Sequence, residues 1–363
     1  MRIAIVYLGR RGAGGVISLQ IARQLAQRHQ VVAVISRALE NLRSWDSSLQ
    51  RVEVETYRNA AGAFLSLVFP IQAHRIADQI RQFKPDAIFF PMFHPWNFLI
   101  QKSLRDTPSV IVVHDPRPHP DLAGRFYEKL ENVSIRRASR CVVLSETLKP
   151  HLAGRGADSV RIDTIPLGPF SYSTRVHPEP NRPPTILFFG RIMPYKGLET
   201  LLDAFAKLRS KMDCQLILAG EGNLAPYASL LAGLPSVNVL NRWIPEEEVG
   251  DLFARSDLVI LPYTSASQSG VIPIAATFGL PVIATRAGGL VEQVEDGVSG
   301  WLVEAGDAQA LSAAMLEALS LPEEARRRGQ ALKSRYEMQF SWEQFARRLE
   351  KSFEMAARPR GPK

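Results

Sequence analysis

The chain has 363 residues, 44 Lys and Arg against 36 Asp and Glu, and a formal net charge of +8 at pH 7. This length is enough for two ordinary domains, and 46% hydrophobic with 22% charged residues excludes a disordered chain and a multispanning membrane protein. No apolar run reaches the ~18 residues of a transmembrane helix, so we expect a globular cytoplasmic protein.

The basic charge balance is compatible with nucleic acid, anionic lipid or phosphorylated substrates as partners, and equally with a solvated basic surface. Basic residues are dispersed, and no helix-turn-helix, zinc-finger or RNA-binding signature is present, so we expect no nucleic acid partner. Cys141 and Cys214 lie in or beside apolar strand-like runs. This favours two reduced core thiols over a disulfide.

Short apolar runs alternate with amphipathic segments, which is the pattern of parallel sheets covered by helices on both faces. The first set of predicted strands is 2–7, 31–35, 51–56, 87–91, 109–113, 140–144 and 161–165. Residues 168–184 contain five prolines and little periodicity, and are predicted to form an interdomain linker. Strands resume at 185–189, 215–218, 257–261, 281–284 and 300–303. The sequence therefore predicts two doubly wound domains, whose ligands bind beyond the carboxyl ends of the strands.

Two further segments are strongly apolar. A stripe of large apolar side chains at helical spacing runs along 341–357, namely Trp342, Phe345, Leu349 and Phe353. It predicts a buried helix. The segment 59–71, NAAGAFLSLVFPI, allows two interpretations. It is either a core helix or strand, or a lipid-facing surface that the basic balance would assist.

Glycine-containing loops follow predicted strands in both halves of the chain. Gly12, Gly14 and Gly15 are predicted to lie in the loop after the first strand, where the lack of a Cβ lets the backbone approach a ligand. His114 stands at the carboxyl end of another strand, a place where histidines often serve function. Both features point to the same edge of the first sheet.

The second half has two loops that suit a phosphate. Gly190, Arg191 and Lys196 lie between a strand and a helix, with Arg191 as a bidentate fork and Lys196 as a compact charge. Gly270 opens a later helix, whose first N–H groups are expected to face an anion. Two helix starts and two cations meeting at one diphosphate predict catalysis on an activated phosphate ester.

Nine short pieces, in the same order, resemble the retaining glycosyltransferases of family 4, the glycosyl transferases of group 1, which have the GT-B fold. The pieces are GAGG (12–15), VHD (113–115), VLSE (143–146), TIPLG (164–168), GRIMPYKG (190–197), LAGEG (218–222), SQSG to GLP (267–281), AGGLVE (287–292) and DGVSGWLV (296–303). The resemblance covers most of the chain. It implies an α/β protein of two doubly wound Rossmann-like domains facing each other across a cleft.

The same resemblance implies a division of labour along the chain. Residues 1–167 would form the acceptor-side domain, 168–184 the linker, and 185–340 the nucleotide-sugar donor domain. The helix 341–357 would bridge back to the first domain. The implied enzyme is a hexosyltransferase-like protein that moves a sugar from a nucleotide-diphosphate sugar to a polysaccharide, glycolipid or lipid-linked precursor of the cell envelope.

Two alternatives stay open. One is another GT-B enzyme, such as a nucleotide-sugar epimerase or hydrolase, and the other is an inactive sugar-nucleotide-binding protein. For the transferase we expect the cytoplasm as the setting, with peripheral contact on the inner face of an anionic membrane.

The resemblance also assigns roles to residues. In the family, the residues matching Arg191 and Lys196 contact the donor diphosphate, and the one matching His114 points toward the sugar hydroxyls, so these three are expected to be catalytic. The expected donor-binding residues are Gly14, Gly15, Gly190, Glu221, Gln268, Ser269, Gly270 and Val271.

The chain departs from the family pattern at two positions. Many members carry two glutamates eight residues apart, and here these fall on Ser267 and on Ile274 or Ala275. We expect Ser267 and its two neighbours to replace the sugar contact with neutral hydrogen bonds, and we expect Ala275→Glu to be tolerated.

We expect no metal and no cofactor beyond the nucleotide sugar. The other common glycosyltransferase architecture uses an Asp-x-Asp pair to hold a divalent metal, and this sequence contains no Asp-x-Asp. It also lacks Cys-x-x-Cys and His-x-x-x-His. Side chains and helix termini would then have to stabilise the diphosphate charge.

Overall fold

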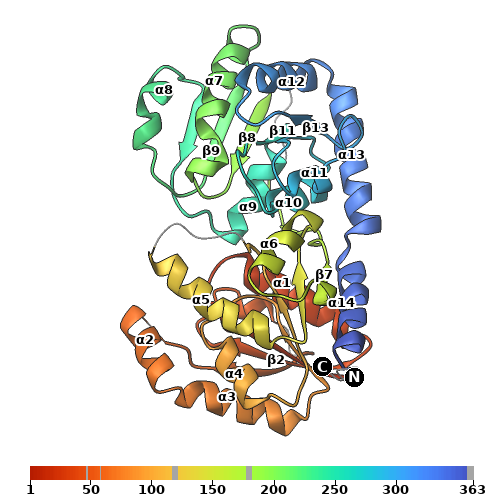
Figure 1. Cartoon of the computed structure of the whole chain (residues 1–363). Helices are drawn as coiled ribbons and strands as arrows, with labels where there is room; N and C mark the ends of the chain where they lie inside the picture. Colours follow the sequence, from red (N-terminus) through yellow and green to blue (C-terminus); the bar gives the residue numbers. More distant parts are fainter. Residues whose placement is uncertain (46–47, 58, 117–121, 177–181, 358–363) are drawn as a thin grey trace. The chain divides into compact units, whose positions relative to one another are not determined.

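The computed structural model describes residues 1–45, 48–57, 59–116, 122–176 and 182–357. The chain divides into two compact units, which Figure 1 draws with their elements labelled. The first unit is Met1–Pro166 together with the segment that begins at Trp342, and the second is Leu167–Ser341. Each unit is built around one parallel sheet.

The first unit contains a seven-stranded sheet in the order β3-β2-β1-β4-β5-β6-β7, with every neighbouring pair parallel. Its strands are β1 (Arg2–Tyr7), β2 (Gln30–Ser36), β3 (Gln50–Val54), β4 (Ala87–Phe90), β5 (Ser109–Val112), β6 (Arg140–Val143) and β7 (Ile162–Thr164). Its helices are α1 (Ala13–Ala26), α2 (Ala60–Val68), α3 (Ile71–Phe83), α4 (Asn97–Ser103), α5 (Leu122–Arg137), α6 (Lys149–Gly154) and α14 (Trp342–Ala357), with 3₁₀ turns η1 (Leu42–Ser44), η2 (Glu146–Leu148) and η3 (Ser159–Arg161). The strand order reverses between β1 and β4.

Helices cover both faces of this sheet (Figure 1), as the alternation of strands and helices predicts. α1 and α14 pack against each other and against strands, whereas α3, α4 and α5 form a second connected layer. Because both faces are covered, the strands are continuous apolar runs. Ile3, Ala4 and Ile5 of β1 are accordingly buried.

α14 carries the apolar stripe that the sequence predicts for the C-terminal helix. All four of its large apolar residues are buried: Trp342, Phe345, Leu349 and Phe353. The Phe353 ring meets the Phe89 ring of β4 edge to face, with centroids 6.0 Å apart. The Ser352 hydroxyl donates to Asp163 Oδ2 at 2.7 Å. α14 is therefore part of the core of the first unit.

The second unit contains a six-stranded parallel sheet in the order β10-β9-β8-β11-β12-β13. Its strands are β8 (Thr185–Phe189), β9 (Gln215–Ala219), β10 (Val237–Leu240), β11 (Leu258–Leu261), β12 (Val282–Thr285) and β13 (Trp301–Val303). Its helices are α7 (Leu198–Arg209), α8 (Ala228–Ala232), α9 (Glu246–Ala254), α10 (Val271–Thr277), α11 (Leu290–Gln293), α12 (Ala308–Ser320) and α13 (Pro322–Gln339), with 3₁₀ turns η4 (Pro194–Lys196) and η5 (Ala225–Tyr227). Here the order reverses between β8 and β11.

The described part of the predicted linker packs on the second unit. Thr174 Oγ1 donates to Asp251 Oδ1 at 2.9 Å, and Arg175 N donates to the same oxygen at 2.8 Å. The backbone of Ser173 passes so close to α9 that a Cβ on Gly250 would collide with its carbonyl oxygen. Residues 177–181 of the predicted linker lie outside the described part of the chain.

Every strand predicted from an apolar run is present, with ends that differ by at most two residues. β10 is an addition that the apolar runs did not predict. Cys141 and Cys214 are buried and free, as expected for reduced core thiols. No helix in the described ranges is long and apolar enough to cross a membrane.

Candidate functional site

The carboxyl edge of the second sheet has a switch point between β8 and β11. Ligands of such sheets bind outside the carboxyl ends of the strands where the strand order reverses. Gly190, Arg191 and Lys196 follow β8, whereas Tyr263 and the segment 267–271 follow β11. The fold therefore brings the two predicted phosphate-binding loops to one switch point.

The loop after β8 runs directly against the loop after β9. Gly190 has a φ of 117°, a conformation that favours glycine. A Cβ on Gly220 would collide with the carbonyl oxygen of Gly190. Ile192 N donates to Glu221 O at 2.8 Å. Glu221 and Arg191 therefore share this edge, and both side chains are exposed.

Lys196 is held between the loops after β8 and β11. Its Nζ lies 3.7 Å from the centroid of the Tyr263 ring and 5.5 Å from that of Tyr195. Thr264 N donates to Tyr195 O at 2.8 Å, which ties the loops together. Burial lowers the pKa of Lys196 to about 8; Tyr195 opposes this effect and the charge of Arg191 adds to it. This cation is poorly solvated and suited to an anionic ligand.

Arg191 differs from Lys196 because its guanidinium reaches solvent. It forms no ion pair with any residue in the described ranges, so its fork can donate hydrogen bonds to phosphate oxygens. Over the same ranges, no group of three His, Cys, Asp or Glu side chains is placed to hold a metal ion.

The loop before α10 is held by a glutamine from another helix. Ser269 N donates to Gln293 Oε1 at 2.7 Å, and Gln293 Nε2 donates to Ser269 O at 2.9 Å and to the Tyr336 hydroxyl at 3.0 Å. Ser269 Oγ in turn accepts from Val271 N at 3.2 Å. The N–H groups of Ser269 and Val271 thus have acceptors inside the protein, and donor binding by Ser269 and Val271 stays a prediction.

Two other predictions for this loop have different outcomes. Gly270 is the N-cap of α10, as predicted for the residue that opens this helix. Gln268 is half-buried, and its Oε1 is buried with no hydrogen-bond partner among the described residues. Donor binding by these two residues stays a prediction.

The second glutamate position of the family falls inside the core. Ile274 and Ala275 of α10 are both buried, and Ala275 is fully so. The burial of Ala275 argues against the expectation that Ala275→Glu is tolerated, because an unpaired carboxylate there would lose its hydration.

Gly14 and Gly15 are not in a loop. They lie in the first turn of α1 and are buried, whereas Gly12 is the N-cap with a φ of 83°. A Cβ on Gly14 would lie 2.8 Å from the Tyr7 hydroxyl oxygen, and a Cβ on Gly15 would collide with the Asn41 side chain. A side chain at either position would have to displace these neighbours at the switch point of the first sheet. The prediction that they approach a donor stays untested.

His114 stands at the carboxyl edge of the first sheet, just after β5. Its Nε2 lies 2.9 Å from Pro91 O, and a carbonyl only accepts, so Nε2 carries the proton. Burial lowers the pKa of His114, while the Pro91 hydrogen bond and Asp115 oppose this shift. The imidazole is thus neutral at pH 7 and leaves Nδ1 as an acceptor.

The sequence did not single out three residues that shape these sites. Tyr263 supports Lys196, Gln293 holds the loop before α10, and Tyr7 fills the space beside Gly14. Tyr7 and Tyr263 each stand at or just after the carboxyl end of a strand beside a switch point. That position is the one signal in the sequence that marks them.

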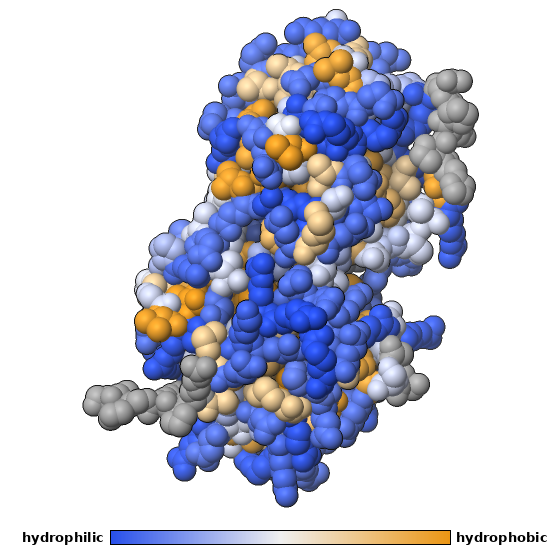
Figure 2. Space-filling model, turned by 90° about the vertical axis from the view of Figure 1, so that its right-hand side faces the viewer, coloured by the Kyte–Doolittle hydropathy of each residue, from blue (hydrophilic) through white to orange (hydrophobic). Residues whose placement is uncertain are grey.

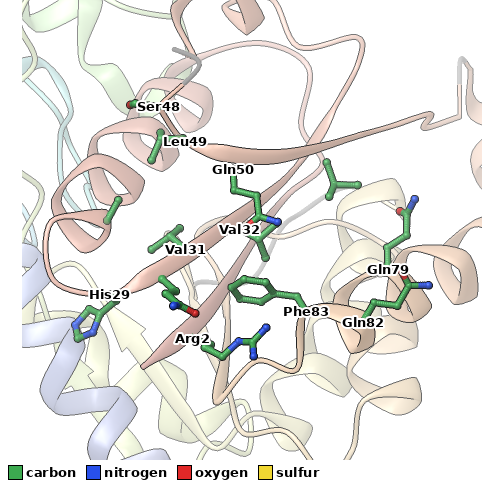
Figure 3. Close-up of a pocket in the computed structure, with 13 residues that line it drawn as sticks. Arg2, His29, Val31, Val32, Ser48, Leu49, Gln50, Gln79, Gln82 and Phe83 are labelled. Atoms are coloured by element: carbon green, nitrogen blue, oxygen red, sulfur yellow. The ribbon is translucent and has the colours of Figure 1, made fainter.

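A separate cavity lies at the amino edge of the first sheet. Its volume is about 760 Å³, and Figure 3 shows Val31 and Val32 of β2 together with the amide side chains of Gln50, Gln79 and Gln82. Its polar and aromatic lining includes Arg2, Gln30, Gln50, Gln79, Gln82 and Phe83. None of the predicted site residues lines this cavity, and it stands at the opposite edge of the sheet from His114.

Two family models match the chain in the regions that contain these sites. The model of the glycosyl transferase 4-like domain matches residues 12–168, and that of glycosyl transferases group 1 matches residues 183–320. Two doubly wound parallel α/β domains with this match define the GT-B fold. The chain belongs to the group 1, or family 4, glycosyltransferases.

Curated relatives are similar over parts of their length. The D-inositol 3-phosphate glycosyltransferase of Segniliparus rotundus is 30% identical over 261 residues, covering 67% of this chain and 57% of that protein. The GDP-mannose-dependent alpha-(1-6)-phosphatidylinositol monomannoside mannosyltransferase of Mycolicibacterium smegmatis is 30% identical over 162 residues, covering 41% of this chain and 42% of that protein. The chain thus spans about half the length of the curated relatives it matches.

Solved structures share the fold over nearly the whole chain. Anabaena HepE in complex with UDP and glucose has a TM-score of 0.75 at 18% identity, covering 98% of this chain and 99% of that one. A glycosyltransferase from Rickettsia africae has a TM-score of 0.73 at 20% identity, covering 98% of both chains.

Proposed function

We propose that this protein is a retaining glycosyltransferase that moves a sugar from a nucleotide-diphosphate sugar to a saccharide, glycolipid or lipid-linked acceptor of the cell envelope. The observation that carries the proposal is Lys196, a half-buried cation at the switch point of a glycosyltransferase donor unit. Two similar proteins support this choice of donor and acceptor. HepE is seen with UDP and glucose, and one relative is named for phosphatidylinositol monomannoside.

The chemistry follows from charge that develops on the leaving diphosphate. Breaking the anomeric C–O bond leaves negative charge on phosphate oxygens, and cations fixed beforehand stabilise it without reorganisation. Arg191 supplies a fork from solvent, and Lys196 supplies a charge that has already lost part of its hydration. In the first unit, neutral His114 would accept a hydrogen bond from a sugar hydroxyl through Nδ1.

The proposed reaction needs no metal or other cofactor, because Arg191 and Lys196 take the role of a divalent cation. Transfer from UDP-glucose or GDP-mannose should persist after exhaustive chelation with EDTA. Loss of transfer on chelation, with recovery on adding magnesium or manganese, would contradict this part of the proposal.

Native mass spectrometry tests the donor directly. We expect one nucleotide sugar, with UDP-glucose and GDP-mannose tried first, to bind wild-type protein and to bind Lys196→Ala weakly. Product analysis with donor alone then separates a transferase, which needs an acceptor, from an epimerase or hydrolase, which does not. Binding with no turnover on any saccharide or lipid acceptor would indicate an inactive binding protein.

We further propose peripheral contact of the first unit with the inner face of an anionic membrane. The segment 59–71 forms α2 and the start of α3, and it exposes large apolar side chains: Phe64, Leu65, Val68, Phe69 and Ile71. The interpretation of this whole segment as core is wrong. Exposed His74 and Arg75 follow on α3, where basic residues favour anionic headgroups.

This apolar surface is confined to one side of the first unit. α2 stands on the opposite side of the first unit from α14 in Figure 1, and the face on the α14 side is mainly hydrophilic with small separate apolar spots (Figure 2). Inserted apolar area stabilises binding by roughly 25 cal/mol per Å², and each nearby basic residue adds about 1 kcal/mol.

Sedimentation with vesicles tests this contact. Wild-type protein should bind phosphatidylserine vesicles at low salt, release at high salt, and bind less after Leu65→Ser. Leu321→Ser is the matched control, because Leu321 is 52% exposed in the second unit and Leu65 is 56% exposed. Equal loss in both variants, or no vesicle binding at low salt, would point to a soluble acceptor.

A further inference from the structure

Aromatic side chains gather at the carboxyl edge of the first sheet. Tyr57 follows β3, Phe93 follows β4, and Phe126 and Tyr127 lie on α5. We call these four residues the aromatic rim. Phe126 and Tyr127 are 45% and 40% exposed, and the other two are half-buried. Large rings left in water at a ligand-binding edge are typical of a recognition surface.

The rim stands on a fixed base. The Tyr57 ring stacks on the buried His94 ring with centroids 5.4 Å apart and an interplanar angle of 21°, and it meets Trp96 edge-on at 5.7 Å. The Arg10 guanidinium carbon lies 5.3 Å from the centroid of the same ring. Trp96 is anchored in turn, because its Nε1 donates to Ser66 Oγ of α2 at 2.8 Å. The Tyr57 ring is therefore positioned before a ligand arrives.

The rim is angled rather than flat. The Phe93 and Tyr127 rings are 6.3 Å apart at 73°, and the Phe126 and Tyr127 rings are 6.0 Å apart at 64°. Burial, the largest cause, and Tyr127 both raise the pKa of Tyr57, while Arg10 lowers it. The two tyrosines are thus close enough to interact electrostatically. The rim combines ring faces with hydroxyl groups and a nearby guanidinium.

The rim lies beside the residue predicted to contact a sugar. His114 donates to the carbonyl oxygen of Pro91, and Phe93 stands two residues further along the same loop. The loop also carries His94 and Trp96 of the base. A ligand on the rim would therefore lie at the same edge of the first unit as His114.

We propose that the aromatic rim binds the saccharide moiety of the acceptor, an inference that rests on the proposed glycosyltransferase function. A pyranose has C–H faces that pack on aromatic rings and hydroxyl edges that hydrogen-bond to tyrosine and arginine. The exposed large side chains of α2 are Phe64, Leu65 and Val68, and α2 contains no tyrosine or arginine. Since Trp96 contacts α2 directly, a lipid-linked saccharide would place its sugar on the rim and its lipid along α2.

Saturation-transfer NMR with n-octyl β-D-glucoside, below its critical micelle concentration, tests the proposal, and octyl galactoside, mannoside and N-acetylglucosaminide complete the panel. Irradiating protein aromatic protons should transfer saturation to pyranose protons of at least one glycoside. Phe126→Ala and Tyr127→Ala should each weaken this binding by about tenfold. Tyr127→Phe should retain most of it.

Phe64→Ala on α2 is the control, because it should lower transfer to octyl protons and leave the pyranose signals unchanged. Transfer to octyl protons alone for all four glycosides would overturn the inference, as would unchanged pyranose transfer in both alanine variants. A UDP titration distinguishes failure of the rim assignment from failure of the proposed glycosyltransferase function. If UDP binds and the pyranose signals are absent, only the rim assignment fails; if no nucleotide or nucleotide sugar binds, the proposed function fails.

Discussion

Lys196 is a cation that the fold removes partly from water without a carboxylate partner among the described residues. The face of the Tyr263 ring replaces only part of the lost hydration. Burial therefore favours the neutral amine and brings the pKa of Lys196 to about 8. A bound diphosphate would favour the charged form and raise this pKa again.

We expect the kcat/KM of the transferase to fall as the pH rises through about 8, where Lys196 of the free enzyme loses its proton. Below this pH the ammonium is present and the rate should be constant with respect to this group. Lys196→Ala should lower turnover about a hundredfold, or ~3 kcal/mol, at neutral pH. Lys196→Arg keeps its positive charge at high pH, so its kcat/KM should not fall as the pH rises through about 8. If kcat/KM of this variant falls at alkaline pH as in the wild type, the fall does not come from Lys196.

Ala275 gives a prediction that reverses the expectation from the family pattern. Ala275→Glu buries a carboxylate in α10, and we expect a loss of unfolding free energy of about 3 kcal/mol or more. Urea unfolding measures it. Ala313→Glu on α12 is the control, because Ala313 is exposed and its substitution should change stability little. Equal stability of the two variants would show that α10 moves to admit the charge.

Single residues also show how far the sequence could predict the site. Arg191 and Lys196 could be proposed from the sequence because charge and glycine spacing are local properties of the chain. The hydrogen bond of Ser269 N could not be predicted, because it depends on Gln293, which is 24 residues from Ser269. A side chain that arrives from a later helix leaves no pattern in the loop it holds.

Elements with one-sided burial were the hardest to predict. β10 (Val237–Leu240) is an edge strand whose residues are exposed or half-buried, so it lacks the apolar run of the central strands. For α2 the mismatch is reversed: its apolar sequence is typical of a core helix, but Phe64 and Leu65 are exposed to solvent. Composition predicts burial only where another element covers the surface.

Gln293 links three elements, since it joins α11 to the loop before α10 and to Tyr336 of α13. Gln293→Met keeps the volume but leaves the buried N–H and carbonyl of Ser269 without partners. We expect a loss of about 1–3 kcal/mol in unfolding free energy, with weaker binding of UDP-glucose as the loop loosens. Gln330→Met on the exposed side of α13 should change neither. Unchanged nucleotide binding in Gln293→Met would separate this loop from the donor site.

At the scale of the whole molecule, sequence order and structural grouping differ at one point. α13 belongs to the second unit, whereas α14 directly after it packs against α1, β4 and β5 of the first. The alternation of strands and helices made both doubly wound sheets predictable. The apolar stripe of α14 predicts which face of the helix is buried, but it does not predict which unit covers that face. The expectation that α14 packs on the first unit came from the family resemblance.

A pair of matched leucines tests this grouping. Leu349 of α14 and Leu332 of α13 are both fully buried, one in each unit. Either Leu→Ala change should cost about 3–5 kcal/mol through the cavity it leaves. Hydrogen exchange measured by mass spectrometry should then show faster exchange in β1, β4 and β5 for Leu349→Ala, and in the second sheet for Leu332→Ala. If Leu349→Ala instead speeds exchange only in the second unit, α14 does not stabilise the first sheet. If both variants speed exchange everywhere, the two units unfold as one cooperative body.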